Sequence, residues 1–194
     1  MDRAQAHTLE AITASLILVS SLVFALQVTA VTPLTGSTSS QHIENQQAAA
    51  AEGVLASAAE NRTLTPTLLY WNESERNWHG ASTDGYAEGA PPTAFGDTLE
   101  EMFLDRGIVF DLTLYYVDDD GDRRRESIVD LGDPSDHAST ARRTVTLGDD
   151  DPLRAPDGSA SDTTLSNASY LVPDADTDQA LYSVVEVELV VWRM

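Results

Sequence analysis

The sequence has no cysteine and no lysine, and each absence excludes a class of structure or partner. Without cysteine, neither disulfide bonds nor thiolate metal sites can form. Without lysine, all 11 basic residues are arginine, against 32 acidic residues, and the net charge is −21. The longest basic run, Arg123–Arg125, lies among acidic residues. We therefore expect no phosphate-binding surface and no nucleic-acid partner.

The sequence also lacks the motifs that mark catalytic and metal sites. Its four histidines form no pair at zinc-ligand spacing, and no glycine-rich phosphate loop is present. Ser135, Asp136 and His137 are adjacent, whereas a catalytic triad assembles residues from separate segments. Residues 118–122 and 174–178 are rich in Asp but lack the glycine position of an EF-hand, which favours acidic turns. We predict no enzyme, metal, cofactor or small-molecule substrate.

The acidic residues are spread through the chain beyond residue 44 and do not form one tail. Such a distribution is typical of a solvated folded surface. Carboxylates at this density repel one another unless molar salt shortens the Debye length to about 3 Å. We therefore expect a halophilic protein that folds in high salt.

Residues 11–31 carry no charge and are mostly apolar around the whole circumference of a helix. About 20 helical residues cross a hydrocarbon layer of roughly 30 Å. We therefore predict one transmembrane helix over residues 11–31, ended by Pro33 and Gly36. The alternative is a secretory signal cleaved after Ala30. Against it, signal-peptide cores usually have about 7–15 residues, and the leader here contains Glu10.

Flanking charge predicts the orientation of this helix. Arg3 is the only basic residue before Arg62, and basic residues favour the cytoplasmic side. We expect localisation to the cell membrane as a single-pass protein, with the N-terminus cytoplasmic and the C-terminal domain extracellular. Three candidate glycosylation sequons, at Asn61, Asn72 and Asn167, agree with an outer location.

The first ten residues resemble the leader of type IV pilins. In archaeal pilins and archaellins, a prepilin peptidase cuts after a charged residue followed by a small one, often just before Gln. Here that cut falls between Ala4 and Gln5, which follow Arg3. The acid near the mature N-terminus is thought, in that family, to pair with the new terminal amine during assembly. Glu10 matches this acid by type, although it would be sixth in the mature chain where pilins have it fifth.

The wider sequence is similar to a family of haloarchaeal pilin-like membrane proteins with no known activity. The segments that carry the resemblance are residues 3–11, 24–34 and 39–47. The resemblance implies a pilin-like, membrane-anchored surface protein, as a minor subunit of a type IV pilus-like filament or secretion pseudopilus. Its partners would be the membrane and other pilin-like subunits, contacted through the apolar helix. The alternative is a permanently anchored extracellular binding protein that joins no filament.

We divide the chain into four parts. They are a short leader (1–10), the transmembrane helix (11–31), a linker with a membrane-proximal helix (32–62), and an acidic extracellular domain (63–194). In the last part, alternating apolar residues predict strands over 108–117, 127–131, 144–147 and 182–192, the first two joined as a hairpin. Short helices are predicted to open at Thr65-Pro66 and at Asp97 with Glu100, the second ending at Gly107.

These elements predict an α+β fold, with an N-terminal transmembrane helix followed by helices and a mostly antiparallel β-sheet. The region between Trp78 and Gly96 contains several Gly and Pro residues, which predicts a loop. Tyr70, Trp71 and Tyr86 lie near the predicted short helices or in this loop. We expect these aromatic residues and Trp78 to form core, and not a binding surface.

Overall fold

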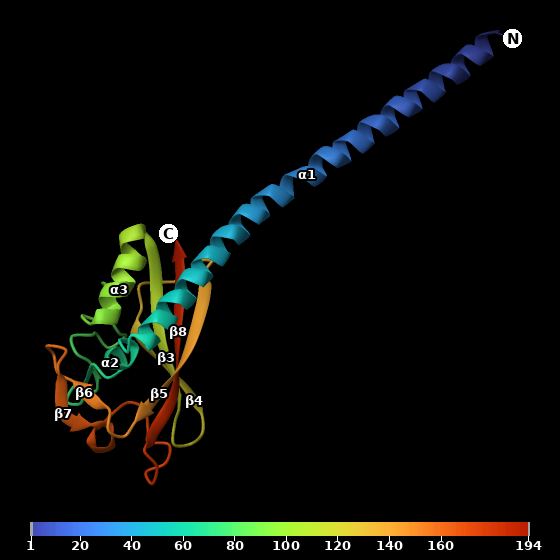
Figure 1. Cartoon of the computed structure of the whole chain (residues 1–194). Helices are drawn as coiled ribbons and strands as arrows, with labels where there is room; N and C mark the ends of the chain where they lie inside the picture. Colours follow the sequence, from blue (N-terminus) through green and yellow to red (C-terminus); the bar gives the residue numbers. More distant parts are fainter. Residues whose placement is uncertain (1, 194) are drawn as a thin grey trace. The chain divides into compact units, whose positions relative to one another are not determined.

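The computed structural model describes the backbone of residues 2–193 and the side chains of residues 7, 10–26 and 41–193. The chain divides into two units, residues 1–43 and residues 44–194. Helix α1 (Asp2–Glu60) contributes to both units, and the strands belong to the second (Figure 1). The second unit combines helices with antiparallel sheets, which confirms the predicted α+β class.

The backbone of α1 is helical from Asp2 to Glu60, so the predicted end at Pro33 and Gly36 is wrong. Proline removes one hydrogen bond from a helix interior, but its fixed φ near −65° is itself helical. Glycine costs only about 1 kcal/mol relative to alanine. Neither residue therefore has to stop a helix that is hydrogen-bonded on both sides of them. Pro33 and Gly36 were predicted to end the helix, whereas here they only weaken it.

The predicted transmembrane helix over residues 11–31 is also corrected. Among the residues that the structure describes, no helix is both long enough and apolar enough to cross a membrane. The apolar run with described side chains, residues 11–26, spans only about 24 Å at the helical rise. Its serines and threonine lower its hydropathy further. The side chains of residues 27–31 lie outside the described part.

The second unit is built on a four-stranded antiparallel sheet in the order β4-β3-β8-β5. Its strands are β3 (Ile108–Val117), β4 (Arg123–Val129), β5 (Ser139–Gly148) and β8 (Leu181–Arg193). The apolar strands β3 and β8 are central, paired from Ile108 opposite Arg193 to Tyr115 opposite Glu186. The edge strands β4 and β5 carry five arginines, and charge on an edge discourages pairing with other chains.

The predicted strands are confirmed with shifted ends: β5 begins five residues before residues 144–147 and ends one residue after them, and β4 begins four residues before residues 127–131 and ends at Val129. The β3–β4 hairpin is confirmed as well, with Gly121 in the left-handed region at φ 83°. Two small sheets were not predicted. They pair β1 (Trp71–Asn72) with β2 (Asn77–Trp78), and β6 (Pro152–Arg154) with β7 (Ala160–Thr164).

Two short helices start earlier than predicted. Helix α2 (Leu64–Leu68) begins before Pro66, and α3 (Ala94–Met102) begins before Asp97. Thr93 is the true N-cap of α3, because its extended backbone lets the hydroxyl accept a hydrogen bond from the Gly96 N–H at 3.2 Å. Helix α3 ends at Met102, earlier than the predicted end at Gly107; the 3-10 turn η1 (Leu104–Arg106) follows, and Gly107 ends that turn with φ 69°. A second such turn, η2 (Leu165–Asn167), precedes β8.

One face of the sheet forms the core together with the last turns of α1, α2 and α3. The buried residues from α1 and α3 are Ala51, Val54, Leu55, Ala58, Phe95 and Leu99. They pack with alternate residues of the central strands, such as Phe110 and Leu112 on β3 and Val187 and Leu189 on β8. The prediction that the aromatic residues form core is confirmed for Tyr70, Trp71 and Trp78, which are buried, while Tyr86 is partly buried against them.

Candidate assembly surface and acidic pocket

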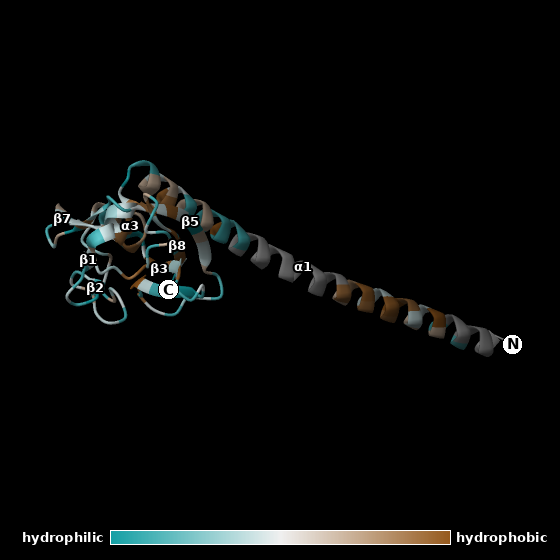
Figure 2. Cartoon of the chain, turned by 90° about the horizontal axis from the view of Figure 1, so that it is seen from below, coloured by the Kyte–Doolittle hydropathy of each residue, from teal (hydrophilic) through white to brown (hydrophobic). Residues whose placement is uncertain are grey.

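The most apolar exposed surface of the described chain lies on α1. We define the apolar segment as residues 11–26, seen as the brown stretch of α1 in Figure 2. Its large side chains are between 46% and 71% exposed: Ile12, Leu16, Ile17, Leu18, Val19, Leu22, Val23, Phe24 and Leu26. Soluble monomers rarely expose a contiguous apolar surface of this kind. The segment is therefore a candidate contact surface.

Two serines of the apolar segment donate hydrogen bonds to the backbone of their own helix. The Ser15 hydroxyl donates to the Ala11 carbonyl at 2.8 Å, and the Ser21 hydroxyl donates to the Ile17 carbonyl at 2.8 Å. Because these hydroxyls already have partners, placing them against another apolar surface leaves no donor unsatisfied. These two serines can therefore be buried at little polar cost.

Glu10 lies one residue before the apolar segment, on the same helix. Its carboxylate is 3.8 Å from the His7 ring Nδ1, and both side chains are 82% exposed. An ion pair this open contributes little to stability, so the Glu10 carboxylate stays available to another partner. Ala4 and Gln5, the predicted processing residues, lie within the helical backbone of α1, and their side chains are outside the described part.

The three sequon asparagines lie in different surroundings. Asn61 and Asn167 are exposed, the first just after α1 and the second in η2. Their side-chain amides donate to Ser57 Oγ at 3.1 Å and to Thr164 Oγ1 at 3.0 Å. Asn72 is half-buried in β1, and its side-chain oxygen accepts from the Ser74 N–H at 3.0 Å. Whether any of them carries a glycan stays a prediction.

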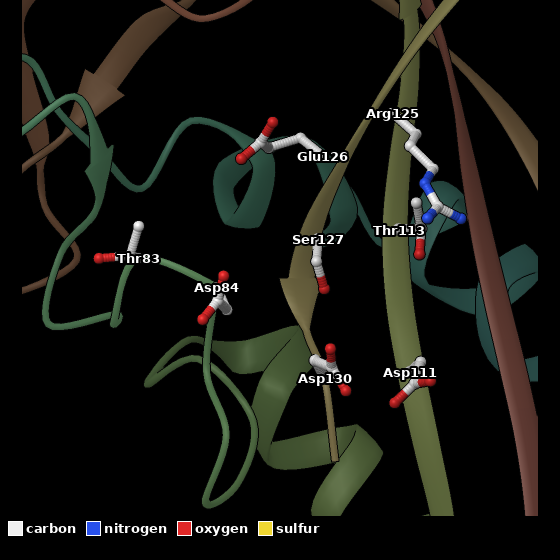
Figure 3. Close-up of a pocket in the computed structure, with 8 residues that line it drawn as sticks. All are labelled: Thr83, Asp84, Asp111, Thr113, Arg125, Glu126, Ser127 and Asp130. Carbon is white, nitrogen blue, oxygen red and sulfur yellow. The ribbon is translucent and has the colours of Figure 1, made fainter. Parts of the chain in front are cut away.

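A pocket of about 320 Å³ lies beside β3 and β4 and was not predicted from the sequence. Figure 3 shows its lining: Thr83, Asp84, Asp111, Thr113, Arg125, Glu126, Ser127 and Asp130. The lining therefore combines four carboxylates with one guanidinium. Within the described part of the chain, no group of three or more histidine, cysteine or acidic residues is placed to hold a metal ion.

Asp111 is the most perturbed carboxyl of this pocket. Its pKa is raised to about 6, mainly by burial; the nearby Asp130 and Asp133 add to the rise, and a hydrogen bond from the Leu131 N–H at 2.9 Å opposes it. Burial also raises the pKa of Glu126. The signal in the sequence was that Asp111 is the only charged residue of β3, where strand alternation was taken to place it in solvent. Asp111 therefore takes up its proton at a higher pH than an ordinary aspartate.

The outward face of the sheet carries a second set of charges. The Arg123 guanidinium donates to Glu186 at 2.6 Å and lies 4.3 Å above the Tyr115 ring. Arg142 donates to Glu188 at 2.6 Å, and the Tyr115 hydroxyl donates to the other Glu188 oxygen at 3.0 Å. Glu188 is buried by these neighbours although it faces outward. Alternation along β8 placed Glu186 and Glu188 on one face correctly, but their arginine partners come from other strands.

The acidic turn between β3 and β4 binds its own backbone and a neighbouring arginine. One Asp118 carboxylate oxygen accepts from the Asp120 and Asp122 N–H groups, and the other accepts from Arg124 at 2.5 Å. The Arg124 guanidinium and these N–H groups hold the pKa of Asp118 below its usual value. This arrangement confirms the prediction of a hairpin turn at residues 118–122.

The fold defines a class of α+β proteins in which a long N-terminal helix carries an exposed apolar segment and then joins an antiparallel sheet. Within that class, the chain belongs to DUF7288, a family of unknown function whose match covers residues 3–191. Neither the curated proteins nor the solved structures contain a match to the chain.

Proposed function

We propose that the chain is a pilin-like subunit that assembles with other subunits through the apolar segment of α1. The filament would be a type IV pilus-like filament or a secretion pseudopilus, in which this chain is a minor component. The observation that carries the proposal is the exposure of the large apolar side chains between Ile12 and Leu26. Burying each of them against neighbouring helices contributes roughly 1 kcal/mol or more.

The distribution of these side chains favours several neighbours over one. Four consecutive residues, Leu16 to Val19, are all apolar and at least 60% exposed. Successive residues of a helix are about 100° apart, so these four point in all directions around its axis. A helix that pairs with one partner needs only an apolar stripe. A helix that is apolar all round suits the interior of a bundle, as in a pilus-like filament.

The position of Glu10 agrees with this proposal. In such an assembly a carboxylate at the border of the apolar segment needs a cationic partner, because a charge left alone among apolar helices is costly. If the leader is cut between Ala4 and Gln5, the new amine of Gln5 on a neighbouring subunit supplies that partner. The exposed His7 contact at 3.8 Å does not compete strongly with it.

The absence of cysteine gives a direct test, because any introduced thiol is then unique. Leu16→Cys and Leu22→Cys place a thiol in the apolar segment, and Thr98→Cys places one on the exposed surface of α3 as a matched control. After mild oxidation of cells that express each variant, we expect disulfide-linked dimers from the first two variants and few from the control. A chain with both Leu16→Cys and Leu22→Cys should give species larger than dimers, since each helix has several neighbours.

A second change separates assembly from unspecific helix contact. Glu10→Gln keeps the size of the side chain but removes its charge, so it should lower both the cross-linking of Leu16→Cys and the amount of protein in sheared filaments. Cross-linking no stronger than that of Thr98→Cys would overturn the assembly proposal. Unchanged cross-linking after Glu10→Gln would keep the helix contact and remove Glu10 from the mechanism.

A further inference from the structure

In the unit of residues 44–194, the exposed large apolar side chains that the structure describes gather at one end of the sheet. They are Val117 (53% exposed), Leu181 (40%) and Val184 (49%). Val117 ends β3 while Leu181 and Val184 begin β8, and the two strands are antiparallel neighbours. Val117 and Val184 line one open pocket of about 290 Å³, together with Tyr115, Arg123 and Glu186. We define Val117, Leu181 and Val184 as the sheet patch.

Charges of both signs border the sheet patch, which is unusual in a chain of net charge −21. On β4, Arg123 opposes Val117 and Arg125 opposes Tyr115. The acidic turn at residues 118–122 connects these two strands directly. The patch thus has an apolar centre, a basic side and an acidic side within a few residues of one another. An apolar centre with a polar rim is the usual construction of a protein interface.

Some of these rim charges have no ionic partner in the described part of the chain. Arg123 pairs with Glu186, and Arg124 pairs with Asp118. No salt bridge between described side chains involves Arg125, Asp119 or Asp120, and all three residues are exposed. The rim therefore offers one cation, Arg125, which also lines the acidic pocket, and the carboxylates of Asp119 and Asp120, none of which forms an ion pair among the described side chains.

We infer that the sheet patch binds the same patch of a second copy of this chain, related by a two-fold axis. In a two-fold contact, each residue of one copy that lies away from the axis meets a different residue of the other copy, and the same pair occurs twice. A surface with positive and negative side chains beside an apolar centre is therefore complementary to itself. Arg125 of one copy then faces the Asp119–Asp120 turn of the other, and Val117 and Val184 pack near the axis. The contact uses no residue of the apolar segment, so it is independent of the proposed assembly helix.

The test uses the full chain with one thiol at the centre of the sheet patch. Val184→Cys should form disulfide-linked dimers about tenfold more than the control Thr98→Cys in molar salt. In the Val184→Cys chain, either Arg125→Asp or Asp120→Arg alone should lower the dimer yield about tenfold, because each brings like charges together across the axis. The chain with both changes should recover the yield, since the charges have exchanged sides.

Three results would each overturn the inference. A yield from Val184→Cys equal to that of Thr98→Cys overturns the inference, and so does a double charge exchange that fails to recover the yield while tryptophan fluorescence shows the fold intact. Capture of a different protein at Val184 in place of a second copy also overturns it. Cross-linking of Leu16→Cys is measured in parallel. If Leu16→Cys fails to cross-link while Val184→Cys does, only the assembly proposal is rejected. If Val184→Cys fails to cross-link while Leu16→Cys does, only the sheet-patch contact is rejected.

Discussion

The two halves of α1 place their apolar side chains in opposite environments. In the half that belongs to the second unit, Ala51 and Leu55 are 0% and 1% exposed against the sheet of their own chain. In the apolar segment, Leu18 and Phe24 are 71% and 69% exposed. The part of α1 in the second unit has its apolar residues on one stripe, which a single surface can cover. The apolar segment has them all around the helix. One helix thus combines a surface that is buried within its own unit with an apolar surface that is exposed.

Charge separates the same two regions. The apolar segment contains no charged residue, whereas almost all of the 32 acidic residues follow it. Conditions that act on carboxylates should therefore disturb the second unit and leave the helix of the apolar segment unaffected. Substitutions that act on apolar contacts should affect stability in one half of α1 and assembly in the other. The predictions below use these differences, beginning with the largest expected effect.

Removal of salt should unfold the second unit. When salt falls from molar to about 0.1 M, the Debye length grows from about 3 Å to roughly 10 Å, and repulsion among the surface carboxylates increases. All three tryptophans, Trp71, Trp78 and Trp192, are buried in this unit, so their fluorescence reports its unfolding separately from α1. We expect the emission to shift to longer wavelength as salt is removed. An unchanged spectrum across this range would reject the expectation of a halophilic protein.

Truncation of the same residue type in the two halves of α1 should give different results. Leu55→Ala leaves a cavity in the core and should lower the free energy of unfolding by about 2–5 kcal/mol. Leu16→Ala removes an exposed side chain and should change it by less than about 0.5 kcal/mol, while lowering assembly. Denaturant unfolding followed by tryptophan fluorescence measures both. Equal losses of stability would show that the apolar segment also packs on its own chain.

The sequence predicted most of the sheet because β3 and β8 follow strand alternation closely. Val187 and Leu189 are buried as their pattern requires, and the 118–122 turn joins β3 to β4. The short strands β1, β2, β6 and β7 were missed because segments of two to five residues are too short for a periodicity to appear. Tertiary packing, and not local propensity, holds them.

The errors on α1 have a different physical origin. Hydropathy in a window of the sequence predicted a span over residues 11–31, but the described helix does not reach the required length and apolarity. Pro33 and Gly36 were given the strength of stop signals, although each only lowers helix stability. The pocket around Asp111 was missed because its residues come from two strands and the loop at Thr83 and Asp84. Their proximity depends on the sheet register, which a linear pattern does not contain.

Replacement of Asp111 should change stability less than Leu55→Ala and shows how the second unit tolerates a half-buried charge. Burial raises the pKa of Asp111 from 3.8 to about 6. Between these values the folded chain holds a proton that the unfolded chain releases, so the free energy of unfolding falls as pH rises and the loss is complete above pH 6. Asp111→Asn keeps the acceptor for the Leu131 N–H and removes the charge. It should raise the free energy of unfolding at pH 7 by about 1 kcal/mol, after a discount for solvent screening, and should flatten its dependence on pH between 4 and 6.

Asp162→Asn, on the exposed surface of β7, is the matched control and should leave the pH dependence unchanged. Denaturant unfolding in molar salt at pH 4.5 and pH 7 measures both variants, and an Asp111→Asn chain no more stable than the wild type at pH 7 would show that the pocket solvates the carboxylate fully.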